Sequence, residues 1–148
     1  MDLIKELLAD HRKFNLAISK IQQYVLDREH RYFSDGRKAE SSAKVLKHVQ
    51  QLIDELHAHE RREHEDLYPM ILKFFPDLRG AIAEIELQHH GLEAAVAELG
   101  RIVRGEREAS NREIAKRVME LLVLLKSHMR HEEKGLFTPI LAAAQEAI

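Results

Sequence analysis

Cysteine is absent from this sequence of 148 residues. Its absence excludes disulfide bonds, thiolate metal ligands and iron–sulfur clusters held by this chain, and it leaves His, Asp and Glu as the strong metal ligands. A chain of this length can bury a hydrophobic core without such cross-links and fits one domain of ordinary size. We therefore expect residues 1–148 to form a single domain.

An excess of charge of one sign and long apolar runs are also missing. Lys and Arg number 23 against 25 Asp and Glu, for a formal net charge of -2, and a near-balanced surface argues against nucleic acid or an anionic membrane as the main partner. No apolar run approaches the roughly 18 residues of a membrane span. The N-terminal stretch MDLIKELLADH is amphipathic and acidic, unlike a cleavable leader. We expect a soluble cytoplasmic protein.

Strand signals are scarce, and helical signals replace them. There is little alternation of polar and apolar residues and no Asn-Gly or Asp-Gly hairpin flanked by strands. Apolar residues instead recur at helical spacing in four blocks, Leu3 to Val25, Val45 to Met70, Ile82 to Val103 and Ile114 to Ile140. Four helices with short connections pack as antiparallel neighbours. The expected fold class is all-α, an up-down-up-down four-helix bundle.

Two stretches of the chain repeat one another. His59–Pro69 and His128–Pro139 share His-x-x-x-Glu, then Leu with an aromatic residue, then proline. Because positions i and i+4 of a helix lie on one face, each stretch can aim an imidazole and a carboxylate at one point. This ligand set suits iron, manganese or zinc, and the two oxygens of a carboxylate can bridge two ions. Two such half-sites facing each other would make a dinuclear centre.

Each proline is expected to kink or end its helix, with a short continuation beyond.

Histidines also fill gaps in the apolar stripes. Every expected helix places a histidine where an aliphatic residue would be expected, and two add a glutamate on the same face: His11, His59 with Glu63, His89, and His128 with Glu132. One core histidine is more often a structural residue than a ligand, and one His-x-x-x-Glu pair is often an exposed contact. The joint pattern outweighs this interpretation, since a buried carboxylate without a cation must stay protonated or cost several kcal/mol. We predict a metal site at these six residues.

The pattern resembles the hemerythrin-like family, also called the HHE cation-binding domain. The resemblance covers nearly the whole chain and rests on four motifs: Ala-Asp-His11, His59-x-x-x-Glu63 with Leu-Tyr-Pro, Gln-His89-His-Gly-Leu92, and His128-x-x-x-Glu132-Glu with Leu-Phe. It implies a four-helix bundle with a non-haem centre of two oxo- or hydroxo-bridged iron ions. The four histidines would be terminal ligands, and Glu63 and Glu132 would be bridging carboxylates. The family's uses include oxygen binding, iron or oxygen sensing, and responses to nitric oxide or peroxide.

The sequence departs from the oxygen-carrying hemerythrins in two places. Their third helix has His-x-x-x-His, whereas Glu93 stands four residues after His89, and their fourth has His-x-x-x-x-Asp, whereas Glu132 and Glu133 stand at the four- and five-residue spacings. One imidazole fewer and one carboxylate more would make the site more anionic, which favours ferric iron and counts against reversible oxygen carriage. Glu93 is the first candidate for a seventh metal ligand. The alternatives are Glu60, His90 and Glu133.

The expected function is that of a di-iron protein that binds or reacts with oxygen, nitric oxide or peroxide, as a sensor, scavenger or store. One alternative is a di-iron peroxidase or oxidase, or an iron donor for iron–sulfur cluster repair, because redox-active iron with an open position does this chemistry readily. The sequence, however, shows no substrate pocket and no nucleophile beside a base. A metal-free interaction module is disfavoured by the inward glutamates. The metal, the physiological ligand and the oligomeric state are left open, and an oligomer is compatible with the sequence.

Overall fold

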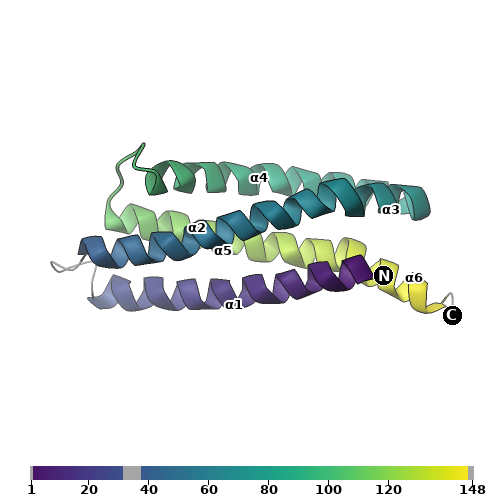
Figure 1. The fold of residues 1–148 in the computed structure, drawn as a ribbon, viewed down its shortest axis with the longest axis horizontal. Coiled ribbons are helices and arrows are strands. Elements are labelled where there is room, and N and C mark those ends of the chain that lie inside the picture. The colour runs from purple at the N-terminus through teal and green to yellow at the C-terminus, as the bar shows by residue number, and fades with distance from the viewer. Residues whose placement is uncertain (1, 32–37, 147–148) are drawn as a thin grey trace.

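Four long helices form the bundle in the computed structural model, which describes residues 2–31 and 38–146, with side chains described for 2–25 and 44–146. They are α1 (Asp2–Arg31), α2 (Lys38–Arg62), α4 (Arg79–Val103) and α5 (Asn111–Glu132). The helices run alternately up and down (Figure 1), and α1 and α4 each pack against both α2 and α5. The described residues contain no strand. The predicted all-α, four-helix architecture is confirmed.

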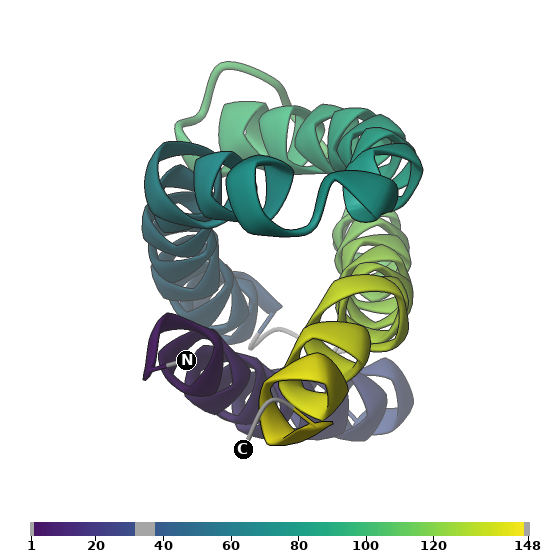
Figure 2. The ribbon, with the colours of Figure 1, turned by 90° about the vertical axis from the view of Figure 1, so that its right-hand side faces the viewer.

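Short continuations extend two of the long helices. The chain leaves α2 through a π-helical turn, Glu63–Leu67, into α3 (Tyr68–Phe74), and it leaves α5 through a second π-helical turn, Glu133–Phe137, into α6 (Thr138–Glu146). Figure 2 looks along the bundle from the end where α3 and α6 lie, close to the N-terminus. A 3₁₀ turn, Pro76–Leu78, then connects α3 to α4.

Proline explains why both π-helical turns occur at matching places. Pro69 and Pro139 are the second residues of α3 and α6, and a proline ring would clash with the carbonyl four residues before it in a regular α-helix. In the wider turn the N–H of Tyr68 reaches the carbonyl of Glu63 instead, and the N–H of Thr138 reaches that of Glu133. The prediction of an interrupted helix with a short continuation is confirmed. Single π-helical turns often accompany functional sites.

The connection from α4 to α5 has a clear local cause at each end. Gly105 adopts a φ of 74°, a left-handed conformation that suits glycine, and the amides of Gly105 and Glu106 bond to the carbonyls of Ile102 and Arg101 in a Schellman ending. Ser110 then caps α5, because its Oγ accepts a hydrogen bond from the N–H of Glu113 at 3.1 Å. None of the helices in the described ranges combines the length and the apolar character needed to cross a membrane.

Two apolar clusters fill the interior, with a polar layer between them. The first cluster includes Phe14, Leu56, Leu92 and Leu125, and the second includes Leu7, Leu67, Ile85 and Leu136. Along each long helix, the predicted metal ligands lie between a residue of the first cluster and a residue of the second. The apolar layers therefore enclose the polar one on both sides.

Candidate metal centre

The six side chains that the sequence singles out are brought together in the polar layer. None of them is more than 4% exposed. They form two groups of four, within each of which the potential ligand atoms lie within 4.8 Å of one another. Glu63 and Glu132 belong to both groups; His11 and His59 complete the first, and His89 and His128 the second.

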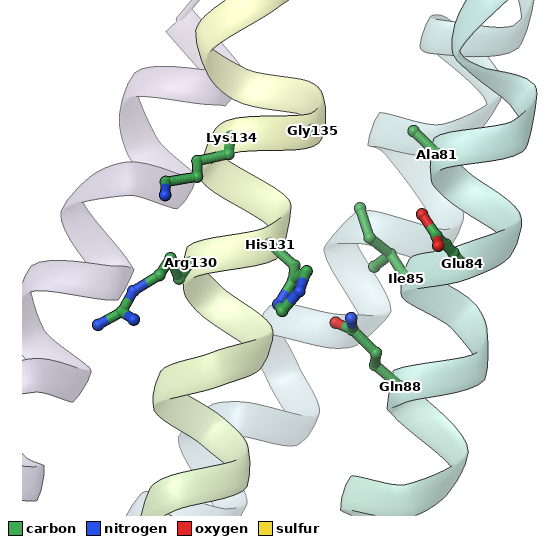
Figure 3. Close-up of a pocket in the computed structure, with 8 residues that line it drawn as sticks. All are labelled: Ala81, Glu84, Ile85, Gln88, Arg130, His131, Lys134 and Gly135. Carbon is green, nitrogen blue, oxygen red and sulfur yellow. The ribbon is translucent and has the colours of Figure 1, made fainter.

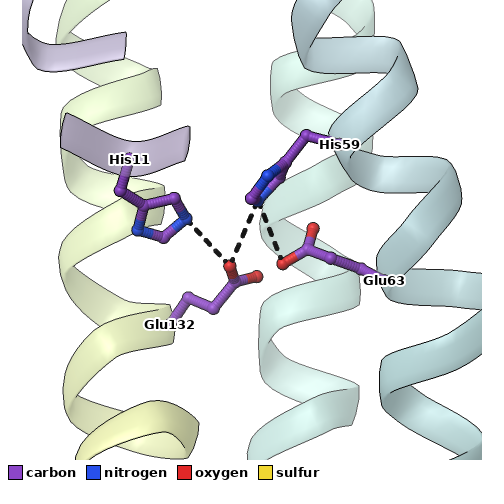
Figure 4. Close-up of side chains that lie close together, drawn as sticks. All are labelled: His11, His59, Glu63 and Glu132. Carbon is purple, nitrogen blue, oxygen red and sulfur yellow. Dashed lines mark hydrogen bonds and ion pairs between the residues drawn. The ribbon is translucent and has the colours of Figure 1, made fainter. Parts of the chain in front are cut away.

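The first group converges on one oxygen of Glu132 (Figure 4). Nε2 of His11 lies 3.1 Å from Oε1 of Glu132, and Nε2 of His59 lies 3.7 Å from the same oxygen. Nε2 of His59 is also 3.5 Å from Oε2 of Glu63. Two imidazoles and two carboxylates, from α1, α2, the π-helical turn Glu63–Leu67 and α5, thus aim at one point.

The second group uses the opposite oxygens of the same two carboxylates. Nε2 of His89 lies 3.7 Å from Oε1 of Glu63, and Nε2 of His128 lies 3.6 Å from Oε2 of Glu132. The two Nε2 atoms are 2.9 Å apart. Each carboxylate therefore turns one oxygen toward each histidine pair, which is the orientation that a bridge between two cations needs.

The pKa values of the side chains in the centre are shifted in opposite directions. Burial lowers the pKa of His89 and of His128 to about 4. Burial acts in the same direction on His59, but its interactions with the carboxylates of Glu132, Glu63 and Asp10 outweigh burial and raise the pKa to about 10. Burial together with the charge of Glu132 raises the pKa of Glu63. For Glu132, burial is outweighed by Glu63 and the surrounding histidines, which hold its pKa low. One carboxylate and one histidine thus carry protons that a cation would displace.

Several buried polar atoms of the centre lack hydrogen bonds and are available to coordinate a cation. Nε2 of His59, both carboxylate oxygens of Glu63 and Oε2 of Glu132 have no hydrogen-bond partner among the described residues. Desolvated polar atoms without partners cost free energy, and nitrogen and oxygen lone pairs aimed at a common point are suitable ligands for a divalent cation. The donor set therefore fits metal binding.

Asp10 contacts one of the predicted ligands, His59, and the sequence did not indicate this contact. The Nδ1–H of His59 donates to Oδ2 of Asp10 at 2.9 Å, and Nη1 of Arg62 lies 3.6 Å from the same oxygen. Asp10 stands next to His11 in the first motif. Adjacent residues on a helix point about 100° apart, however, so Asp10 is not on the inward stripe by which the ligands were found.

Tyr68 also borders the centre. It is 4% exposed, its hydroxyl has no hydrogen-bond partner among the described residues, and its ring centroid lies 6.5 Å from that of His89 and 5.2 Å from that of His64. Burial and the nearby charge of Glu63 raise its pKa, so the hydroxyl keeps its proton. From the sequence alone, an aromatic residue on an apolar stripe cannot be distinguished from one that only packs in the core.

The structure does not bring the candidates for a seventh ligand into either group. Glu93 is exposed, because Leu92, which is 1% exposed, occupies the inward position of that helical turn. Glu60 is buried but lies outside both groups, and His90 is exposed. Oε2 of Glu133 is 3.8 Å from Nδ1 of His11, on the side of the ring away from Glu132. The expectation of an extra carboxylate at the centre therefore has no support in these positions.

A surface cleft lies beside the centre, between α4 and the end of α5 (Figure 3). Its volume is about 280 Å³, and none of the six residues lines it. Gln88 and His131 face each other across it, and the Nδ1–H of His131 donates to the carbonyl of Ser127 at 2.7 Å. Ile85, which is 2% exposed, also lines the cleft and belongs to the core. The cleft thus neighbours the polar layer without containing any of its potential ligands.

Comparison with known proteins identifies a family that matches this geometry. The family model described as the hemerythrin HHE cation binding domain matches residues 2–140, a span that includes all four long helices and all six buried His and Glu residues. No curated protein and no solved structure matches the chain. The resemblance seen in the sequence motifs is confirmed, and the chain belongs to the hemerythrin HHE cation-binding domain family.

Proposed function

We propose that this chain is a non-haem di-iron protein that binds or reacts with oxygen, nitric oxide or peroxide, as a sensor, scavenger or store. His11, His59, His89 and His128 would be terminal ligands, and Glu63 and Glu132 would bridge the two ions. One observation supports the proposal most strongly: each of the two carboxylates directs one oxygen toward each histidine pair.

Iron is the proposed occupant because of both the donor set and the family. Imidazole with carboxylate suits iron, manganese and zinc alike, and the chain belongs to a family of cation-binding domains. When bound, iron supplies redox chemistry and an open coordination position for a small ligand. Zinc would supply neither a change of oxidation state nor an optical signal.

The surrounding residues have distinct tasks in this proposal. The apolar clusters on both sides of the polar layer exclude water from it. The hydrogen bond from His59 to Asp10 holds one proton on Nδ1, so the proton that a cation would displace is the one on Nε2. Glu63, which holds a proton in the metal-free protein, would release it when a cation binds.

The burial of the centre favours a small ligand. Each of its six side chains is at most 4% exposed, and the neighbouring cleft is not lined by any of them. A diatomic gas or peroxide needs far less space than an organic substrate. This burial supports the binding or reaction of small molecules over an enzyme that handles a bulky substrate.

An optical experiment tests the proposal. Protein loaded with iron(II) under anaerobic conditions should gain near-ultraviolet absorption in air and a different spectrum with nitric oxide. The variant His59→Ala should lose these changes. His57→Ala, at an exposed position on the same helix, is the matched control and should keep them. Iron-loaded protein whose spectrum responds to neither oxygen, peroxide nor nitric oxide would contradict the proposal.

A further inference from the structure

The four histidines of the centre differ on their outer sides. All four direct Nε2 toward the carboxylates, but only the pair from the first group has carboxylates near Nδ1. The Nδ1–H of His59 donates to Asp10 at 2.9 Å, and Nδ1 of His11 lies 3.8 Å from Oε2 of Glu133. The Nδ1 atoms of His89 and His128 are buried and have no hydrogen-bond partner among the described residues.

We propose that the two cation positions are unequal, with the His11–His59 position binding its cation more tightly and filling first, and with Asp10 as the positioning residue responsible. This inference rests on the proposed dinuclear function. Glu63 and Glu132 serve both positions, and each position has two histidines. The difference in affinity must therefore arise from the contacts behind the imidazoles.

The hydrogen bond to Asp10 acts on His59 in two ways. It fixes the tautomer that leaves Nε2 as the lone-pair donor, and it raises the basicity of that nitrogen while holding the ring in place. Asp10 is itself held, because it lies between His59 and Arg62, and Arg62 also pairs with Glu6. The orientation of His59 is therefore set before a cation arrives.

The His89–His128 position lacks this preparation. Its two Nε2 atoms are 2.9 Å apart and pair with each other, and this pairing must be broken before both can coordinate a cation. No hydrogen bond from Nδ1 to a described residue fixes either ring. A cation at this position must reorganise the ligands that hold it, which lowers its affinity.

Titration with cobalt(II) measures the two affinities directly. Metal-free protein is titrated under anaerobic conditions and followed by calorimetry and by the visible absorption of bound cobalt. We expect two separate binding steps. Asp10→Asn should weaken the tighter step by about 10- to 100-fold, the usual effect of losing a carboxylate partner of a ligand histidine, and should change the weaker step far less. Asp54→Asn, an equal change of charge at an exposed position on α2, is the control and should alter neither step.

Two ligand variants assign the steps to positions. His128→Gln should keep the tight step, whereas His59→Gln should keep only the weak one. Retention of the tight step in His59→Gln would overturn the inference, even if Asp10→Asn failed to fold. Two equal steps in the unaltered chain, or an equal effect of Asp10→Asn on both, would overturn it as well while leaving the dinuclear centre intact. Binding of one cobalt ion or none by the unaltered chain would instead overturn the proposed function itself.

Discussion

The polar layer lies between the two apolar clusters, yet their energetics are opposite. Burial of apolar side chains stabilises the folded state by about 25 cal/mol per Å² removed from water. The buried histidines and glutamates lose hydration instead, and several of their atoms gain no hydrogen bond to a described residue in return. The apolar clusters therefore stabilise the fold directly, whereas under the proposed function the polar layer is stabilised by a bound cation.

Removal of the cations should have the largest effect on this comparison. A cation that binds only the folded state stabilises it by about 4 kcal/mol when its free concentration is on the order of a thousandfold above its Kd. We expect chelated protein to unfold at clearly lower temperature and urea concentration than loaded protein. Identical unfolding curves for the two forms would mean that the polar layer needs no cation.

A cavity in an apolar cluster should destabilise the protein slightly less than removal of the cations does. Its effect should not depend on whether a cation is bound. Leu125 is fully buried in the first cluster, and Leu125→Ala should lower the free energy of unfolding by about 3 kcal/mol. The loss should be the same in loaded and metal-free protein, as measured by urea unfolding. Leu124→Ala, at the neighbouring position where the side chain is 41% exposed, should have little effect. A loss confined to loaded protein would show that cluster and centre are coupled.

Substitution of Glu63 should have opposite consequences in the two forms. Under the proposed function, Glu63→Gln removes a bridging oxygen, so loaded protein should lose its second cation and the stability that this cation adds. In metal-free protein the raised pKa of Glu63 means that folding must take up a proton, and glutamine avoids this requirement. The metal-free variant should therefore be at least as stable as the parent in urea unfolding. Clear destabilisation of the metal-free variant would indicate that the carboxyl group makes a contact that glutamine cannot replace.

The pH dependence of stability should also differ between metal-free and loaded protein, and its change per pH unit is the smallest of these effects. In metal-free protein, the carboxylates raise the pKa of His59 to about 10 against the lowering effect of burial, and burial together with Glu93 raises that of Glu60 to about 7. The folded state thus holds protons that the unfolded chain releases. Stability contributed by His59 is present at pH 6.5 and lost as the pH rises toward 10, by on the order of 1 kcal/mol per pH unit.

Loaded protein should show the reverse dependence over this range, because cations bind deprotonated ligands more readily as the pH rises. Urea unfolding of both forms at several pH values measures the two slopes. His59→Gln should flatten the slope of the metal-free protein. Slopes of equal sign in the loaded and metal-free forms would show that the cation does not replace protons at the centre.

The four helices and the six inward residues could be predicted from the sequence because both follow from the helical periodicity of apolar residues. His11 and His89 could be found because each stands where an aliphatic residue would continue an apolar stripe. Contacts that depend on how helices face one another could not be found in this way. Asp10 lies off the stripe of its own helix and meets His59 only after α1 packs against α2. Glu93 has the favourable four-residue spacing, but the turn it occupies is oriented by Leu92.

The π-helical turns could be predicted only in part. The prolines at Pro69 and Pro139 predict an interruption, but they do not determine how the chain accommodates it. The structure widens one turn in each half-site, beginning at Glu63 in the first and directly after Glu132 in the second. The two repeats in the sequence therefore correspond to two repeats in the backbone as well as in the side chains.

The number of cations per chain tests the central claim most directly. Protein loaded with iron(II) under anaerobic conditions and weighed by native mass spectrometry should carry two ions per chain, because Glu63 and Glu132 each offer one oxygen to either histidine pair. A chain that carries a single ion, or none, under loading conditions that saturate binding would contradict a dinuclear centre at these residues.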